Sequence, residues 1–559
     1  MSQGAAGGRW WDGAVGYEVY IRSFRDASGD GLGDLDGLAE KMGYLAWLGV
    51  DVVWITPCFP SPRHDGGYDV ADYLRVAEDL GGEPALDRVL AAAHARGMRV
   101  LLDLVPNHTS SEHPWFAASR SSRDDPKRDW YIWRDGATPG PPEQGGTPPS
   151  SWPAHFGGTA WSYDAATGQW WFHLFLPEQP DLDWRNPEVR AAFEEIIETW
   201  LSRGVDGFRI DVAHALVKHP ELPYPPTNMD AWESTPAAHA GAGPGPTIFD
   251  LVNDADIANQ PGVHEVYRRW RAIADRYDAL LVGEVYLLEP GELAPYVADD
   301  ELHLAFWFAP MHLDWEPKEL RRSLEEGART AAGRIAWVTS SHDESRATSR
   351  FGGGEVGRRR ALALATLQFC LPGVPFVYQG EELGLEDVEV PPDRADDPIA
   401  TRAGAHDHSR DRCRTPMPWA PGPGLGFSAV TRDRAPEPWL PMGPRSEGDT
   451  VEVQRADTGS MLRRWRALIA LRRAEPDLRD APVEWLTDDG PVVAVRRGRL
   501  VAVANVADEP ARWTLPAGTW QVAFDAAGEH EAARVAGEVA LGPADAVVVR
   551  KMPEEGQAR

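Results

Sequence analysis

The sequence predicts an α/β fold in which a (β/α)8 TIM barrel carries an inserted domain after its third strand and a C-terminal antiparallel β domain. Short β-rich runs alternate eight times with helical patterns. A long stretch rich in Pro, Gly and Trp interrupts the alternation after the third run, and the helical pattern stops near residue 477. Strand and helix in strict alternation favour a closed parallel barrel, with an open doubly wound sheet as the alternative architecture.

The barrel strands are predicted from short runs rich in β-branched and aliphatic residues. They are Tyr17–Ile21, Asp51–Ile55, Arg99–Val105, Asp206–Asp211, Ala279–Glu284, Leu302–Phe308, Arg334–Thr339 and Pro375–Tyr378. A helix is predicted between the third and fourth strands, where Asn186 can cap, Pro187 suits the first turn and Gly204 follows the end. Its apolar stripe comprises Val189, Phe193, Ile196, Ile197 and Trp200.

Two further features set the domain organisation. Residues 1–106 and 179–476 are assigned to the barrel, residues 107–178 to an inserted domain and residues 477–559 to a C-terminal β-sandwich domain. An insertion as long as 107–178 inside a compact domain is usually functional or folds as a small domain of its own. The stretch STPAAHAGAGPGPT at 234–247 predicts a surface loop.

Composition excludes several classes of protein. A formal net charge of -30 repels nucleic acid and anionic membrane surfaces, so a small neutral or cationic ligand is expected instead. Three scattered Cys argue against a disulfide framework. Neither a secretory signal nor an apolar run long enough to span a bilayer is visible, so we expect a soluble cytoplasmic protein. The oligomeric state cannot be predicted from the sequence.

The stretch GFRIDVAHALVK places two charged residues where a buried strand is predicted. Arg209 and Asp211 are two apart, so they share one face of the strand, while Phe208 and Ile210 point the other way. Buried charge is costly unless it is paired or used. An internal ion pair and a catalytic role are both consistent with this stretch alone.

Other titratable residues follow the predicted strands and favour the catalytic interpretation. Because the chemistry of such a barrel lies at the C-terminal ends of its strands, these residues are expected to converge on one pocket: Asp69, His108, Asp211, Glu284 and Asp343. Clustered acids raise at least one pKa, and two carboxyls about 5 Å apart serve as nucleophile and acid in retaining glycoside hydrolases. Arg209 is expected to keep Asp211 ionised by charge pairing.

Several motifs in fixed order also resemble a known family. GFRIDVAH, VGEV, SSHDE, DLVPNHT and QPDLDW are similar to conserved regions of the α-amylase superfamily of glycoside hydrolases (family 13), with the nearest likeness to its oligo-1,6-glucosidase and α-glucosidase branch. The likeness covers nearly the whole chain. It implies the same barrel, an inserted domain B after the third strand and a C-terminal β domain.

The resemblance also implies roles for individual residues. Asp211 matches the nucleophile that forms a covalent glucosyl intermediate, Glu284 the general acid/base and Asp343 the third carboxylate, which orients sugar hydroxyls. The residues that match those holding the terminal glucosyl ring are Tyr68, Asp69, His108, Arg209 and His342. Arg414 matches an arginine that pairs with the GYD aspartate Asp69 in exo-acting members, which predicts release of glucose from non-reducing ends.

The expected activity is therefore hydrolysis of short α-linked gluco-oligosaccharides of the maltose or isomaltose type, without an organic cofactor. A transglucosylase or isomerase of the trehalose or sucrose type is the alternative, because it uses the same intermediate. A non-catalytic, membrane-anchored relative is disfavoured, since the chain keeps all three acids. The sequence leaves the choice between α-1,4 and α-1,6 linkages open. Ser341 and Asp183 stand where the family usually has Asn, which puts fine substrate positioning in question.

The segment DASGDGLGD predicts a structural Ca2+ site, with Mg2+ as the other candidate. Its expected oxygen ligands are the side chains of Asp26, Ser28, Asp30 and Asp34 and the carbonyl of Leu32. Alternate oxygen ligands on a Gly-rich turn suit a hard cation, and the related glucosidases carry a cation on the corresponding loop. The alternative is an acidic turn stabilised by Asx caps.

Overall fold

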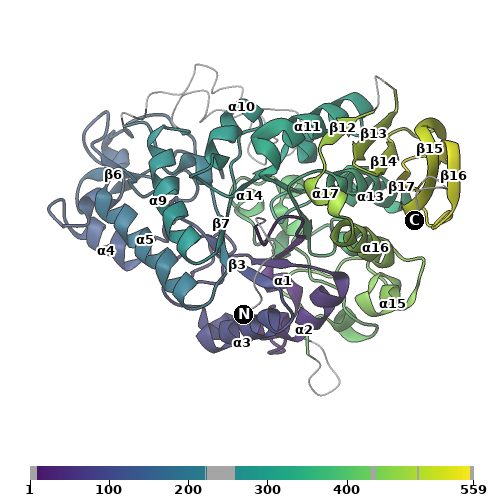
Figure 1. The fold of residues 1–559 in the computed structure, drawn as a ribbon. Coiled ribbons are helices and arrows are strands. Elements are labelled where there is room, and N and C mark those ends of the chain that lie inside the picture. The colour runs from purple at the N-terminus through teal and green to yellow at the C-terminus, as the bar shows by residue number, and fades with distance from the viewer. Residues whose placement is uncertain (1–8, 221, 223–257, 430–435, 487–489, 554–559) are drawn as a thin grey trace.

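The computed structural model describes residues 9–220, 222, 258–429, 436–486 and 490–553, and its centre is a closed barrel of parallel strands (Figure 1). Around the barrel the order is β1, β2, β3, β7, β8, β9, β10 and β11, and β11 pairs with β1. The strands are Gly16–Val19, Val52–Ile55, Arg99–Leu104, Gly207–Ile210, Leu280–Gly283, Leu304–Trp307, Ile335–Trp337 and Val374–Tyr378. Each overlaps one predicted run, so the barrel prediction is confirmed and the open sheet is excluded.

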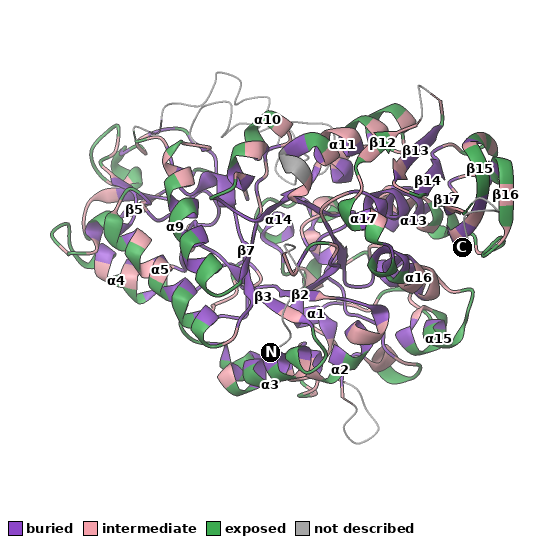
Figure 2. Ribbon diagram, viewed as in Figure 1, coloured by how far each residue is buried: buried purple, intermediate pink, exposed green. Residues whose placement is uncertain are grey.

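Helices connect successive strands and cover the outside of the barrel. They are α2 (Leu35–Leu48), α3 (Gly82–His94), α5 (Pro187–Ser202), α9 (Gly262–Arg276), α10 (Pro290–Leu293), α11 (Pro317–Arg329), α13 (Gly354–Cys370) and α16 (Met461–Ala474). Figure 2 shows buried residues on the sides of these helices that face the barrel and exposed residues on the outer sides. Helix α5 begins as predicted, because the Asn186 side chain accepts a hydrogen bond from the Glu188 backbone N–H.

The inside of the barrel changes from apolar to charged along the strands. An apolar cluster that includes Leu101, Val282 and Phe376 fills the lower part. The next inward-facing residues on the same strands are Asp103 and Glu284, which follow Leu101 and Val282 by two positions. The alternation of a strand therefore places charged groups at the C-terminal end of the barrel, directly above a packed core.

Two β-rich segments lie outside the barrel. Between β3 and α5, helix α4 (Pro114–Ser121) accompanies a three-stranded sheet of β4 (Trp133–Arg134), β6 (Gln169–Phe172) and β5 (Trp161–Asp164). The C-terminal segment forms a six-stranded antiparallel sheet from β12 (Val483–Trp485), β13 (Val492–Arg497), β14 (Leu500–Asn505), β15 (Ala511–Asp525), β16 (Arg534–Leu541) and β17 (Ala546–Lys551). The limits of these two segments as domains stay predictions, and the predicted loop 234–247 lies outside the described residues.

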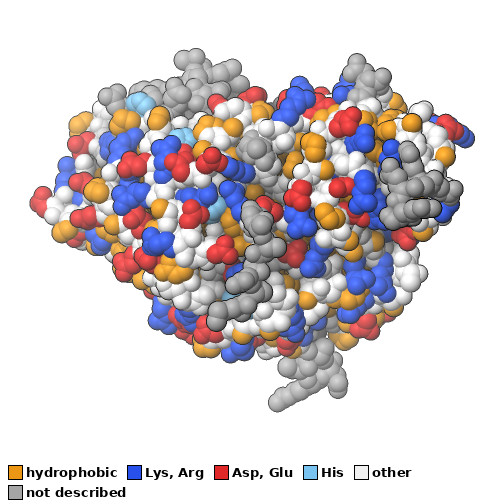
Figure 3. Space-filling model, viewed as in Figure 1, with side chains coloured by type: hydrophobic (Ala, Val, Ile, Leu, Met, Phe, Trp, Pro, Cys, Tyr) orange, Lys and Arg blue, Asp and Glu red, His pale blue; other side chains and the backbone are white. Residues whose placement is uncertain are grey.

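Acidic and basic side chains are intermixed over the face shown in Figure 3. Among the described residues, no helix combines the length and the apolar character needed to cross a lipid bilayer.

Candidate active site

A cavity opens where the barrel strands end, and all three predicted catalytic carboxyls line it. Its walls are formed by Asp65, Tyr68, His108, His155, Phe175, Asp211, Val212, Glu284, Tyr286, Asp343, Glu344, Ile399 and Arg410. Asp211 and Glu284 directly follow β7 and β8, and their carboxyls are hydrogen-bonded to each other. The structure thus brings together acids that lie far apart in the sequence.

The buried guanidinium of Arg209 is the centre of this arrangement. Its Nη1 donates to Oδ1 of Asp211 at 2.6 Å and to Oδ1 of Asp103 at 2.9 Å. Its Nη2 lies 2.9 Å from Oε2 of Glu284. One positive charge is therefore shared by three carboxyl groups, which accounts for the charged inner face of the strand that contains Arg209.

The three carboxyls cannot all ionise easily around one guanidinium. Burial raises the pKa of Asp211, and the charges of Glu284 and Asp103 raise it further against the opposing effect of Arg209. Burial likewise raises the pKa of Glu284, and it raises that of Asp103 to about 7. The charge of Arg209 lowers the pKa of Asp211, as predicted, and burial opposes it, so the ionised state of Asp211 stays a prediction.

Asp343 lies in the opposite electrostatic environment. Its Oδ1 accepts from Arg414 at 2.8 Å and from Arg410 at 3.2 Å, and its Oδ2 lies 3.1 Å from Nε2 of His342. Burial opposes ionisation of Asp343, but His342 and the two arginines together lower its pKa. This carboxylate is ionised at neutral pH, whereas burial raises the pKa of the neighbouring acids Asp211 and Glu284.

Aromatic and imidazole side chains line another side of the cavity. The Tyr68 ring stacks on His342 with centroids 5.4 Å apart, and its hydroxyl donates to Asp103 at 3.0 Å. His342 in turn contacts the buried carboxyl of Glu18 through Nδ1. His108 is bonded to Gln179 at 3.0 Å, and burial lowers its pKa to about 4, so it is neutral at pH 7.

The pairing that we predicted between Arg414 and Asp69 is wrong. Asp69 accepts hydrogen bonds from Ser61 Oγ at 2.7 Å and from the His64 backbone at 2.9 Å, and it does not line the cavity. Arg414 binds Asp343 and the carbonyl of His342. The arginine–aspartate pair on the cavity wall is instead Arg410–Asp65, with Nη2 2.7 Å from Oδ1.

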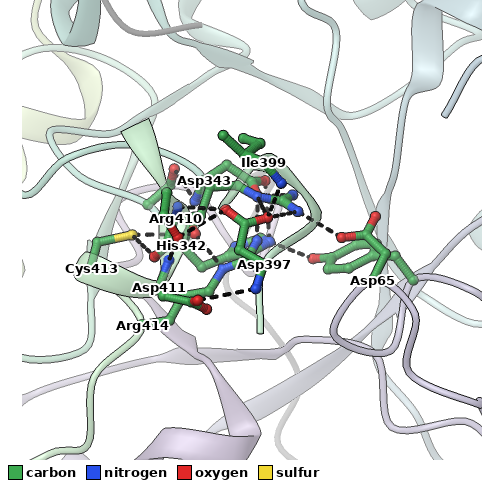
Figure 4. A network of polar contacts seen from close by, with 12 residues as sticks. Asp65, His342, Asp343, Asp397, Ile399, Arg410, Asp411, Cys413 and Arg414 are labelled. Carbon is green, nitrogen blue, oxygen red and sulfur yellow. Dashed lines mark hydrogen bonds and ion pairs between the residues drawn. The ribbon is translucent and has the colours of Figure 1, made fainter. Parts of the chain in front are cut away.

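Arg410 is held by an ion network that is shown in Figure 4. The fully buried Asp397 accepts from the backbone N–H of Arg410 at 2.6 Å, from its Nε at 3.0 Å and from its Nη2 at 2.7 Å. Asp397 also caps the short helix α14 (Pro398–Thr401), which carries the cavity residue Ile399. Asp397 therefore fixes two parts of the cavity wall at once.

Sequence reasoning missed several cavity residues. Asp103 follows the same pattern as the acids that were found, since it shares the inward face of its strand with Leu101, and this signal was available. Asp65 and Arg410 each lie four residues before the residue that was predicted instead, Asp69 and Arg414. The others lie in loops or in the short helix α14, with no local signal of their place: His155, Phe175, Tyr286, Glu344 and Ile399.

The predicted cation loop has its carboxylates bound to backbone groups. Asp26 accepts from the backbone N–H groups of Gly29 at 2.6 Å and Gly31 at 2.8 Å. Asp34 accepts from Gly37 at 2.6 Å and caps α2. Among the described residues, no group of three or more His, Cys, Asp or Glu side chains is arranged to hold a metal. This geometry is that of the Asx-capped turn, the alternative stated for this segment.

Comparison with known proteins agrees with this architecture. Residues 18–481 match the model of the α-amylase catalytic domain. The chain is 33% identical to "Oligo-1,6-glucosidase" of Parageobacillus thermoglucosidasius, covering 91% of this chain and 92% of that protein. It is 37% identical to "Probable alpha-glucosidase" of Rhizobium meliloti, covering 91% of each.

Solved structures show the same likeness. The alpha-glucosyl transfer enzyme XgtA is 34% identical, with a TM-score of 0.86, over 98% of this chain and 100% of that one. The trehalulose synthase MutB from Pseudomonas mesoacidophila MX-45 is 30% identical, with a TM-score of 0.84, over 98% and 100%. The matches extend beyond the barrel to nearly the full length of the chain.

Proposed function

Because the chain belongs to the α-amylase family and is a glycoside hydrolase, we propose that it is a retaining, exo-acting α-glucosidase that releases glucose from the non-reducing ends of maltose-type or isomaltose-type oligosaccharides. One observation carries the proposal. Asp211 and Glu284 face the same cavity, are hydrogen-bonded to each other and share Arg209. Carboxyls this close leave no room for the water that an inverting enzyme places between them.

In the proposed reaction Asp211 attacks the anomeric carbon as Glu284 protonates the departing oxygen. The glycosidic carbon–oxygen bond breaks and a covalent glucosyl ester of Asp211 forms. Glu284 then accepts a proton from water, whose oxygen attacks the anomeric carbon and releases Asp211. The ionised Asp343 stabilises the positive charge that develops on the sugar ring, and the positive charge of Arg209 favours the ionised form of Asp211 that attacks.

The exo-acting part of the proposal rests on the pair Arg410–Asp65. The two side chains lie on the cavity wall, and Asp397 holds Arg410 in place. A buried, anchored ion pair at one end of a sugar site limits that end to a terminal residue. We therefore expect single glucose units as products.

Transfer to a sugar hydroxyl is the second candidate function. It differs from hydrolysis only in the acceptor that attacks the glucosyl ester. Among the similar structures are an enzyme named for α-glucosyl transfer and trehalulose synthases, which favours keeping this candidate.

The experiment that tests the proposal is to follow the purified protein by NMR with maltose, isomaltose, trehalose and sucrose in separate incubations. Glucose that first appears as the α-anomer supports a retaining hydrolase, and new disaccharides support transfer. In parallel, Asp211→Ala is expected to lose at least about 10^4-fold of kcat on 4-nitrophenyl α-glucoside. First appearance of the β-anomer, or activity retained by Asp211→Ala, would contradict the mechanism.

Two further proposals are separate from the catalytic one. A structural Ca2+ or Mg2+ at residues 26–34 is tested by elemental analysis and by Tm in chelator, and an unchanged Tm without bound metal contradicts it. A cytoplasmic location is tested by fractionation of cells that produce the protein.

A further inference from the structure

Besides Asp65 and the three catalytic candidates, a further carboxyl group lines the cavity. Glu344 follows Asp343 in the loop after β10 and lines the cavity together with Glu284 and Tyr286. A smaller adjoining cavity is lined by the same residues and by Phe306 and Phe308. The proposed mechanism uses neither Glu344 nor Tyr286.

Glu344 and Tyr286 lie on a different side of the barrel from Tyr68 and His108, which are predicted to hold the terminal glucosyl ring. Tyr286, His312 and Glu344 come from the loops after β8, β9 and β10, which are neighbours in the barrel. Tyr68 and His108 come from the loops after β2 and β3, on the other side of the ring of strands. If Tyr68 and His108 contact the terminal glucosyl ring, the leaving group, which Glu284 protonates, contacts the loops after β8, β9 and β10.

The chemistry of this side suits a second sugar ring. The Tyr286 ring stacks on Phe308 with centroids 5.1 Å apart, which provides an aromatic wall. The Tyr286 hydroxyl donates to Oε1 of Glu344 at 3.2 Å and contacts Nε2 of His312. In the described part of the chain the hydrogen bonds of the Glu344 carboxyl involve Oε1, so Oε2 can face a bound hydroxyl.

Glu344 also differs from its neighbours in charge. Burial raises the pKa of Glu344 to about 8, and the charge of Asp343 acts in the same direction against Arg350 and Arg410. At neutral pH the group is a carboxylic acid with one O–H to donate. When it ionises, it loses that donor and adds a second negative charge beside Asp343.

We propose that Glu344, supported by Tyr286 and His312, binds the leaving-group sugar of the substrate by donating a hydrogen bond to one of its hydroxyls. The proposal rests on the glucosidase function proposed above and specifies the substrate class further: glucosides whose leaving group is a polyhydroxylated ring bind better than those with a plain aryl group. The same site would hold a sugar acceptor in transfer.

The test compares wild type, Glu344→Gln and Glu344→Ala on maltose, isomaltose and 4-nitrophenyl α-glucoside. In Glu344→Ala the KM for the disaccharide that wild type cleaves is expected to rise about five-fold at neutral pH. The KM for the aryl glucoside should rise less, and kcat for the disaccharide should fall by a smaller factor. In wild type this KM rises further above about pH 8, whereas in Glu344→Gln, which keeps a neutral donor, it does not.

Glu452→Gln, an exposed change in α15 (Val451–Ala456), is the matched control and keeps wild-type kinetics. Should Glu344→Ala fail to fold, Glu344→Gln still carries the test, because it preserves shape and changes the pH profile alone. Wild-type KM values and an unchanged pH profile in the Glu344 variants would overturn the assignment while leaving the glucosidase intact. Absence of turnover of every glucoside by wild type would overturn the proposed function, and the assignment with it.

Discussion

Replacing Asp103 by Asn tests the claim that three carboxyls share the charge of Arg209. Asp103 and Asp211 both accept from the same Nη1, at 2.9 and 2.6 Å, so their oxygens are within about 5.5 Å of each other. At an effective dielectric constant of about 20, two full charges at that distance repel by about 3 kcal/mol, which corresponds to about 2 in pKa. Since the pKa of Asp103 is about 7, Asp103 carries roughly half a charge at neutral pH. At that pH its charge therefore raises the pKa of Asp211 by about 1.

The sign of the effect follows from the charge removed. Without Asp103 the Asp211–Glu284 pair loses its proton more readily, because Arg209 is then shared by two carboxyls. The basic limb of the kcat/KM profile, where that proton is lost, should move down by about 1 to 2 in pH for Asp103→Asn. The variant also loses an acceptor for Trp54 Nε1, now bonded at 3.1 Å, so the free energy of unfolding should fall by about 1 to 3 kcal/mol.

The assay is the pH dependence of 4-nitrophenyl α-glucoside hydrolysis, with stability measured separately by urea unfolding. Asp393→Asn, an exposed position outside the cavity, is the matched control and should leave the profile unchanged. A basic limb that stays in place, or moves to higher pH, would refute the shared-charge description even if the variant is less stable.

The remaining predictions concern the cavity wall and the barrel. Asp397→Asn should raise KM for disaccharides and lower the free energy of unfolding by about 1.5 to 3 kcal/mol, because Arg410 loses its ion pair with Asp397 but keeps those with Asp65 and Asp343. A KM and a Tm equal to those of wild type would contradict this. Asp65→Asn should raise KM, whereas Asp69→Asn should mainly lower Tm, and the reverse result would restore the original pairing. Gly207→Ala should lower the free energy of unfolding in urea by at least about 3 kcal/mol, because φ is +150° and a Cβ would lie 2.0 Å from the Leu280 carbonyl oxygen. Gly43→Ala in α2 serves as the control, because a Cβ there would have no heavy atom within 4 Å.

The barrel could be predicted because its signals are local and repeated. Each buried strand is a short apolar run, and most are followed by a helix of three or more turns with a visible apolar stripe. The residues Asp211 and Glu284 could be placed for the same reason, since they stand at the ends of strands and the topology brings such ends together. Asp103 satisfied the same rule and would have been found by applying it to every strand.

The ion pair on the cavity wall shows where local signals end. The motif HDGGYD offers Asp65 and Asp69, four residues apart, and RDRCR offers Arg410 and Arg414, also four apart. Both choices of pair have the same spacing and the same residue types. What separates them is tertiary: Asp397, more than ten residues away, holds Arg410 on the wall, while Ser61 and the His64 backbone hold Asp69 away from it.

The charge states of the acids depend on the same distant partners. Asp343 is ionised because two arginines from a loop after β11 and His342 surround it, although Glu344, the next residue, keeps its proton. Neighbours in the sequence therefore differ in charge, whereas Asp211 and Glu284, which follow separate strands, both have their pKa raised by burial. A cavity that contains fixed negative charge at Asp343 beside a protonated carboxyl at Glu344 and a carboxyl of raised pKa at Glu284 can both stabilise a developing cation and donate hydrogen bonds to the groups around it. This division follows from which side chains reach each carboxyl, and it is the physical basis on which sugar cleavage at this site depends.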